Sequence, residues 1–304
     1  MMAGKKVKKT PTISAGAEFR TAVDSERPLQ IVGAINAFCA MLAKRAGFRA
    51  IYLSGAGIAN ASHGKPDLGL TTLSNVLEDA RRITKATSLP LIVDADTGFG
   101  QPAECAAALQ DIDVAGMQIE DQVDSKRCGH RPNKVLVSTE DMTARVKDAS
   151  AARRDPDFVI LARTDAASVE GLSSAIDRAG AYLDAGADMI FAEALECLEE
   201  YKNFTLHVDA PVLANLTEFG KTPLFTLEQL RDAGIRLVLY PLSAFRAMNA
   251  AASDVYRTIR ETGTQRDVIS RMQTRDELYD VLDYLAFEKQ LDHEQHKSRK
   301  GDHE

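Results

Sequence analysis

The chain alternates short apolar segments with amphipathic stretches, and this alternation restricts its possible folds more than any other feature. Eight segments are almost continuously apolar, which is typical of parallel strands buried on both faces. They begin at Leu29, Ala50, Leu89, Gly116, Phe158, Asp188, Pro211 and Ile235. Helical periodicity marks the stretches 74–85, 139–153, 170–185 and 245–260, among others. Gly47, Gly186 and Gly234 are placed to end helices before the next strand.

Eight strand segments with helices between them favour a (β/α)₈ TIM-type barrel. A doubly wound open sheet is the alternative, but no GxGxxG follows the first strand segment. A further helical stretch at 275–291 exceeds what eight units need, and we expect it to pack on a neighbouring subunit. The predicted organisation is a flexible basic tail (1–13), a single (β/α)₈ domain that includes this helix (14–291) and a charged tail (292–304).

Composition excludes several classes of protein. The net charge of −7 argues against a nucleic-acid-binding surface. No apolar run approaches the ~20 residues of a membrane span. The cysteines, Cys39, Cys105, Cys128 and Cys197, form neither a CxxC motif nor a Cys/His cluster, as is usual in a reducing compartment. We therefore expect a cytoplasmic protein. Because its net charge is negative, we expect arginines at the binding site itself to bind any anionic ligand.

Carboxylates follow two neighbouring strand segments. Asp94 and Asp96 end one segment and stand two residues apart, so their side chains point to the same side. Glu120 ends the next segment. Oxygen ligands without nitrogen or sulfur favour Mg²⁺, with Mn²⁺ as a further possibility. The alternative is structural: Asp96 could cap a loop while Asp94 pairs with a nearby cation.

Two further strand ends carry groups suited to carboxylates. The segment SGAG, from Ser54 to Gly57, offers backbone N–H groups with little side-chain bulk, although a plain tight turn fits it equally well. Arg163 and Arg246 each follow an apolar segment and could clamp carboxylates through two hydrogen bonds. The alternative for each arginine is an ordinary surface ion pair.

One cysteine stands in a basic loop. Cys128 is surrounded by Lys126, Arg127, His130 and Arg131, and Gly129 follows it. Nearby cations favour the thiolate and lower the pKa of a cysteine, so this thiol could donate and accept a proton. The alternative is a thiol with no role in a basic loop.

These residues carry a family resemblance. The segments SGAG from Ser54, DADTGFG from Asp94, IEDQ from Ile119, KRCGHRPNK from Lys126 and NLTEFG from Asn215 resemble the isocitrate lyase/phosphoenolpyruvate mutase superfamily. LYPLSAFRAMN from Leu239 and MQTRDELY from Met272 are similar to its branch that acts on 2-methylisocitrate. The resemblance covers roughly 14–291, and the KRCGH loop is its most specific part.

The resemblance implies a Mg²⁺-dependent carbon–carbon lyase that splits a tricarboxylate, 2-methylisocitrate, into pyruvate and succinate. Asp94 and Asp96 would hold the metal, with Glu120 in support. Cys128 would deliver a proton to the succinate carbanion, and the implied catalytic set also contains Tyr52, Lys126 and His130. The implied substrate-binding residues are Ser54, Gly55, Ala56, Cys128, Gly129, Arg163, Glu193, Asn215, Leu216, Thr217, Arg246 and Arg275.

The resemblance also implies an apolar pocket for the substrate methyl group, formed by Phe191, Leu239 and Pro241. It implies a homotetramer built from helix-swapped dimers. The chain departs from the family pattern at Ala56, where glycine is usual, and at Gln118, where histidine is common. Two alternatives remain open: a lyase of the same superfamily acting on isocitrate or an oxaloacetate-type acid, and a barrel without catalytic activity.

Overall fold

A computed structural model describes residues 13–127, 129–130 and 133–301, with side chains as far as residue 293. These residues form two compact units, one ending at Phe245 and the other beginning at Arg246. Most of the predicted basic tail (1–12) and residues 302–304 lie outside the described part. The assignment of 14–291 to a single domain stays a prediction.

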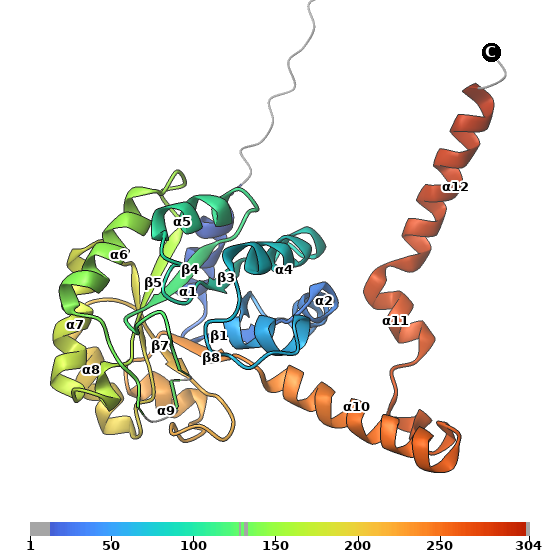
Figure 1. The fold of residues 1–304 in the computed structure, drawn as a ribbon. Helices are drawn as coiled ribbons and strands as arrows, with labels where there is room; N and C mark the ends of the chain where they lie inside the picture. The colour runs from blue at the N-terminus through green and yellow to red at the C-terminus, as the bar shows by residue number, and fades with distance from the viewer. Residues whose placement is uncertain (1–12, 128, 131–132, 302–304) are drawn as a thin grey trace, which may run out of the picture. The chain divides into compact units, whose positions relative to one another are not determined.

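Eight parallel strands of the first unit close into a barrel in chain order, as Figure 1 shows. The strands are β1 (Leu29–Gly33), β2 (Ala50–Leu53), β3 (Leu91–Asp94), β4 (Gly116–Glu120), β5 (Val159–Thr164), β6 (Met189–Ala192), β7 (Val212–Asn215) and β8 (Leu237–Tyr240). Each lies within one of the eight predicted segments. Pairing of Leu29 with Leu237 joins β1 to β8 and closes the sheet. The predicted (β/α)₈ barrel is confirmed and the open-sheet alternative is wrong.

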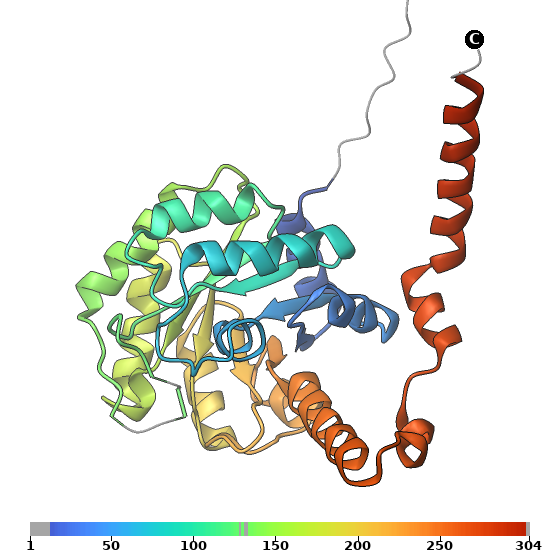
Figure 2. The same ribbon diagram turned by 45° about the vertical axis from the view of Figure 1, so that its right-hand side comes forward.

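Helices surround this barrel, as the two ribbon views agree (Figures 1 and 2). They are α1 (Ala15–Ser25), α2 (Ala37–Arg45), α3 (Gly55–Gly57), α4 (Leu73–Ala86), α5 (Pro102–Gln110), α6 (Thr139–Ala151), α7 (Leu172–Asp184), α8 (Leu198–His207) and α9 (Leu227–Asp232), with short turns η1 (Ile58–Ser62) and η2 (Ala166–Ser168). The predicted glycine stops Gly47, Gly186 and Gly234 all have positive φ. Gly47, Gly186 and Gly234 thus follow α2, α7 and α9 and precede β2, β6 and β8.

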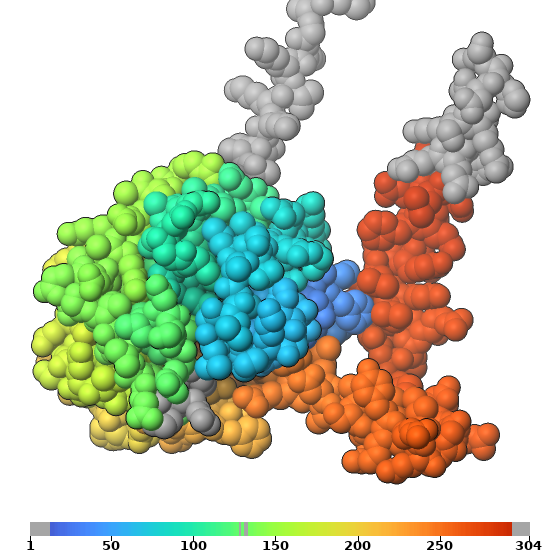
Figure 3. Space-filling model, in the orientation of Figure 1, coloured from blue at the N-terminus to red at the C-terminus, as the bar shows by residue number. Residues whose placement is uncertain are grey.

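The hydrophobic core has two layers. Inside the barrel, side chains such as Ile31, Leu161 and Leu213 pack together, and Phe19 and Val23 of α1 join the same cluster. Outside it, a second layer fills the space between strands and helices. Figure 3 shows the side chains of α4 to α7 packed closely over one face of this unit. Such a rigid scaffold can hold loops at the strand ends in fixed positions.

The second unit is helical. It contains most of α10 (Ser243–Thr262), then η3 (Arg266–Arg271), α11 (Arg275–Leu282) and α12 (Tyr284–Gly301). The predicted continuous helix 275–291 is wrong in one respect: Asp283 adopts a left-handed conformation, φ 51°, and separates α11 from α12. Among the described residues, no helix combines the length and apolar character that crossing a bilayer requires.

Candidate active site

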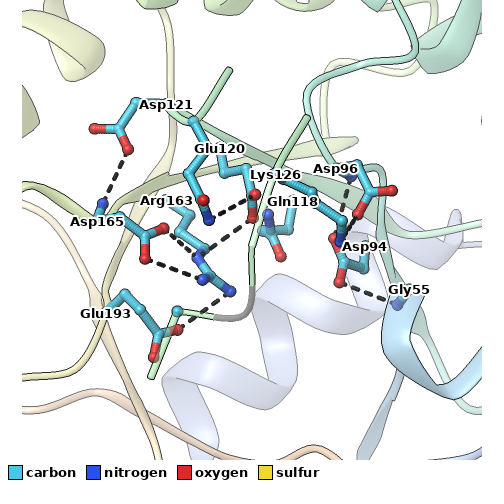
Figure 4. A network of polar contacts seen from close by, with 12 residues as sticks. Gly55, Asp94, Asp96, Gln118, Glu120, Asp121, Lys126, Arg163, Asp165 and Glu193 are labelled. Atoms are coloured by element: carbon cyan, nitrogen blue, oxygen red, sulfur yellow. Dashed lines mark hydrogen bonds and ion pairs between the residues drawn. The ribbon is translucent and has the colours of Figure 1, made fainter. Parts of the chain in front are cut away.

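Polar side chains gather at the carboxyl ends of the barrel strands, as predicted for this fold. Figure 4 shows Glu120, Arg163 and Glu193 pointing toward one another, while Asp94 and Asp96 lie beside Gly55. All of these carboxylates are buried, and Glu193 has no exposed surface. The structure therefore brings residues from β2 to β6, far apart in the sequence, into one charged cluster.

Asp94 and Asp96 stand next to the start of α3. Asp94 accepts hydrogen bonds from the backbone N–H of Gly55 (3.0 Å) and of Asp96 (3.1 Å). A Cβ atom on Gly55 would lie 3.0 Å from Asp96 Oδ1 and 3.1 Å from Asp94 Oδ2. A residue with no side chain at position 55 therefore lets both carboxylates approach the same point.

Lys126 supplies the positive charge beside these carboxylates. Its Nζ forms an ion pair with Asp96 and lies 2.9 Å from Asp67 Oδ1. Burial opposes the charged form, but Asp96, Asp94 and Glu120 together raise the pKa of Lys126 well above its usual range. The side chain is thus an ammonium ion fixed in the acidic cluster.

The Asp94–Asp96 pair fits a magnesium ion. Asp96 Oδ1 is buried and forms an ion pair with Lys126. This oxygen accepts no hydrogen bond from the part of the chain that the structure describes. Mg²⁺ commonly takes one or two carboxylates and fills its other positions with water and substrate oxygens. Within the described residues, no group of three Asp, Glu, His or Cys side chains could hold a metal. A metal here would therefore rest mainly on two aspartates, and the supporting role of Glu120 stays a prediction.

Glu120 is directed away from that pair. Its carboxylate lies 3.4 Å from Arg163 Nε and accepts a hydrogen bond from Gln122 Nε2 (3.1 Å). Burial raises the pKa of Glu120 to about 8, against the opposing charges of Arg163 and Lys126. Burial likewise raises the pKa of Asp96 to about 7, with Lys126 opposing the shift and Asp94 adding to it.

Arg163 is enclosed by carboxylates. It lies 2.9 Å from Asp165, 3.2 Å from Glu193 and 5.0 Å above the ring centre of Phe191. Burial alone would raise the pKa of Glu193, but Arg163 and then His130 outweigh it and lower the pKa to about 2. Arg163 therefore binds protein carboxylates in this structure, and its predicted role as a substrate clamp is untested.

His130 joins two loops. Its Nδ1 accepts a hydrogen bond from the backbone N–H of Lys221 (3.0 Å), so the hydrogen of a neutral imidazole is on Nε2. That Nε2 lies 2.9 Å from Glu193 Oε1. His130 thus connects the KRCGH loop to the loop after β7 and to the buried carboxylate of Glu193.

Gly129 packs directly against Arg163 and Glu193 of the charged cluster. A Cβ atom there would lie 2.4 Å from Arg163 Nη2 and 2.6 Å from Glu193 Cγ. Neither atom belongs to a side chain that is free to move, because both form buried ion pairs. Only glycine fits at this position.

Tyr52 lies in the barrel interior together with Phe191 and Leu239, two residues of the predicted methyl pocket. Its hydroxyl donates to Gln118 Oε1 (2.7 Å). Burial, and then the charge of Asp94, raise the pKa of Tyr52 well above its usual range. Tyr52 is therefore a neutral phenol, and its part in proton transfer stays a prediction. Pro241, the third pocket residue, is also buried.

The remaining predicted residues divide into three groups. Asn215 donates to Glu193 (3.3 Å) and is followed by the buried Leu216 and the half-buried Thr217. In SGAG, the N–H groups of Gly55 and Gly57 already donate to Asp94 and Ser54, and Ala56 is half-buried between them. Arg246 and Arg275 belong to the second unit, and Cys128 lies outside the described residues. Substrate binding by all of these stays a prediction.

Several polar residues of the cluster escaped the sequence analysis. They are Asp67, Gln122 and Lys134. Gln122 and Lys134 stand inside the IEDQ and KRCGHRPNK segments, so their position beside the key residues was the available signal. Asp67 lies in a loop with no periodicity, and only its contact with Lys126 reveals it.

Comparison with known proteins places the chain in a family. A family model described as phosphoenolpyruvate phosphomutase matches residues 19–260. The chain is 58% identical to 2-methylisocitrate lyase of Salmonella typhimurium (strain LT2), over 92% of this chain and 96% of that protein. The chain belongs to the 2-methylisocitrate lyase family. This family consists of carbon–carbon lyases, which confirms the predicted enzyme class.

Solved structures show the wider superfamily of these lyases. A 2,3-dimethylmalate lyase of the PEP mutase/isocitrate lyase superfamily is 31% identical, with a TM-score of 0.85, and covers 94% of this chain and 96% of its own. A phosphonopyruvate hydrolase in complex with oxalate and Mg²⁺ is 28% identical, with a TM-score of 0.79 and coverage of 91% and 97%. A magnesium-binding member therefore shares this barrel, in agreement with the donor set of Asp94 and Asp96.

Stabilisation by Mg²⁺ is expected to depend on pH. Asp96 and Glu120 have a higher pKa in the fold than in an unfolded chain. Their contribution to stability is therefore complete below about pH 4 and is lost as pH rises through about 7 to 8. Because Mg²⁺ competes with the proton on Asp96, its increase of Tm should be larger near pH 8.5 than near pH 6. Thermal unfolding with and without Mg²⁺ measures this.

The control for that experiment is Asp96→Asn, which removes one titrating ligand. We expect this variant to show a smaller Mg²⁺ effect at both pH values. An equal Mg²⁺ shift of Tm at both pH values in the unmodified protein would show that Asp96 does not hold the ion.

Proposed function

We propose that the protein is a Mg²⁺-dependent lyase that cleaves 2-methylisocitrate into pyruvate and succinate, the cleavage step of the methylcitrate cycle in propionate catabolism. The observation that carries this proposal is the 58% identity to a 2-methylisocitrate lyase over 92% of the chain. The charged cluster at the strand ends supports it, since a tricarboxylate needs cations as well as a metal.

The proposed reaction is a retro-aldol cleavage. A general base takes the proton of the substrate hydroxyl, the bond between the two halves breaks to leave pyruvate, and the electron pair of that bond remains on the succinate carbon. Cys128 Sγ then delivers a proton to that carbon. Lys126 forms an ion pair with Asp96, and His130 Nε2 lies 2.9 Å from Glu193. The residues two positions before and after Cys128 in the sequence therefore lie at the charged cluster, which supports this assignment.

Asp94 and Asp96 would hold the Mg²⁺, which supplies positive charge for the oxygen anion that develops during cleavage. Arg163 would bind a substrate carboxylate at the edge of its existing ion pairs with Glu193 and Asp165. Tyr52 would present its fixed hydroxyl to the barrel side of the substrate. We also assign Arg246 and Arg275 to carboxylate binding on the strength of the family pattern.

The extra methyl group of the substrate would contact Phe191, Leu239 and Pro241. All three are buried, and the first two belong to the apolar interior of the barrel. A methyl group in such a pocket is worth about 1–3 kcal/mol, so we expect kcat/KM for 2-methylisocitrate to exceed that for isocitrate by about 10- to 200-fold.

Product analysis tests this proposal. The purified protein should release pyruvate and succinate from 2-methylisocitrate, and little glyoxylate from isocitrate. Faster glyoxylate release from isocitrate would assign the protein to the other substrate. A properly folded protein that releases neither product would support the non-catalytic alternative.

We further propose a cytoplasmic homotetramer built from helix-swapped dimers. Support comes from the second unit, where α10, η3 and α12 expose large apolar side chains. These are Met248, Tyr256, Ile259, Ile269, Tyr284, Leu285, Phe287 and Leu291. Large exposed apolar residues on helices are typical of subunit contacts.

A further inference from the structure

The chain on both sides of residue 128 is held by buried side chains that the reaction does not use. On the N-terminal side, Gln122 is 1% exposed. Its Oε1 accepts a hydrogen bond from the backbone N–H of Arg127 (3.0 Å), and its Nε2 donates to the carbonyl of the same residue (2.9 Å). The same Nε2 donates to Glu120 Oε1 (3.1 Å). One amide therefore links the loop directly to the carboxylate at the end of β4.

Lys134 holds the chain on the C-terminal side. Its Nζ donates to the carbonyl of Gly129 (2.6 Å) and to Asp165 Oδ1 (2.7 Å). The side chain is buried, and a buried ammonium requires partners of this kind. Asp165 also binds Arg163, so Lys134 connects Gly129 to the arginine against which Gly129 packs.

The base of the loop is closed without these two side chains. Val123 N–H donates to the carbonyl of Val135 (3.0 Å), and Val137 N–H donates to that of Asp121 (2.9 Å). Arg145 adds hydrogen bonds to the carbonyls of Glu120 and Gln122. Gln122 and Lys134 act instead at the tip, on the two residues that flank position 128.

We propose that Gln122 and Lys134 are positioning residues that fix the backbone of Arg127 and Gly129 relative to Glu120 and Asp165, and so hold this loop against the charged cluster where the reaction takes place. This inference rests on the proposed function for its catalytic consequence. The Gln122 amide and the Lys134 ammonium are suited to this role, because each donates to a backbone carbonyl of the loop and to a buried carboxylate at once.

The test compares Gln122→Met and Lys134→Met, which keep side-chain length and remove the polar ends. Displacement of the loop tip should lower kcat by about 10- to 100-fold. We expect KM for 2-methylisocitrate to change by less than about threefold, since neither side chain binds substrate. Hydrogen exchange at 123–134 should quicken in both variants, while exchange in β4 and β5 remains slow.

A matched control is Gln110→Met at the end of α5. Gln110 also holds backbone groups with both ends of its amide: it donates to the carbonyls of Ala106 and Ala152 and accepts from the N–H groups of Arg154 and Asp155. It lies outside the charged cluster, so its loss should leave kcat and exchange at 123–134 unchanged.

Two results would overturn the inference: a loss of kcat without faster exchange at 123–134, or faster exchange there with kcat unchanged. The exchange measurement needs no substrate. If the unmodified protein failed to cleave 2-methylisocitrate while both variants loosened the loop, the proposed function would fail and the structural role would stand. If one methionine variant does not fold, the other tests the same claim from the opposite side of residue 128.

Discussion

Replacement of Cys128 by serine is expected to lower kcat for 2-methylisocitrate by about 10²- to 10⁴-fold, the usual contribution of a positioned general acid. A serine hydroxyl has nearly the size of a thiol but is a far weaker acid. In the sequence Cys128 is flanked by Lys126, Arg127 and His130, and basic neighbours lower the pKa of a cysteine and make it a stronger acid. Steady-state kinetics measures the loss, which should fall on kcat rather than on KM.

Cys197→Ser is the control for this variant. Cys197 is an exposed cysteine at the start of α8, and its loss should leave turnover unchanged. Thermal unfolding should give the same Tm for both variants and the unmodified protein. Full turnover in Cys128→Ser would remove this thiol from the mechanism.

Gly129→Ala is expected to damage both stability and activity. The added methyl would overlap the Arg163 guanidinium and Glu193, which are buried and paired with each other. Overpacking of this kind costs about 1–3 kcal/mol of unfolding free energy. If the loop moves away by about 1 Å to relieve the overlap, kcat should fall by about 100-fold. Chemical denaturation and steady-state kinetics measure the two effects.

Gly180→Ala is the matched control. Gly180 lies within α7, where a Cβ atom would meet nothing within 4 Å. Alanine is favoured over glycine inside a helix by roughly 0.5–1 kcal/mol, so this variant should be slightly more stable and fully active. If Gly129→Ala behaved in the same way, the close approach of the loop to Arg163 would be wrong.

Local sequence patterns were sufficient to predict the barrel. Near-continuous apolar runs require burial on both faces, and only a sheet covered by helices provides it, so all eight strands were found. The break at Asp283 was missed because helical periodicity continues through it. Aspartate can adopt a left-handed conformation, but nothing in its neighbours signals that it does.

In a (β/α)₈ barrel, functional residues lie at the carboxyl ends of the strands. This rule was sufficient to predict which residues gather, but not how they pair. Glu120 was predicted beside Asp94 and Asp96, yet it is paired with Arg163 and Gln122. Pairing depends on side-chain directions across neighbouring strands and on loops such as the one carrying Lys126. Asp67 and Lys134 were missed for the same reason, because each contact spans residues distant in sequence.

The central claim is that aspartates at the mouth of this barrel hold a metal that supports carbon–carbon cleavage. The most direct measurement is release of pyruvate and succinate from 2-methylisocitrate before and after chelation of divalent metal. We expect equal amounts of the two products, loss of activity on chelation and recovery on addition of Mg²⁺. Undiminished cleavage by the chelated protein, or by Asp94→Ala, would contradict this account.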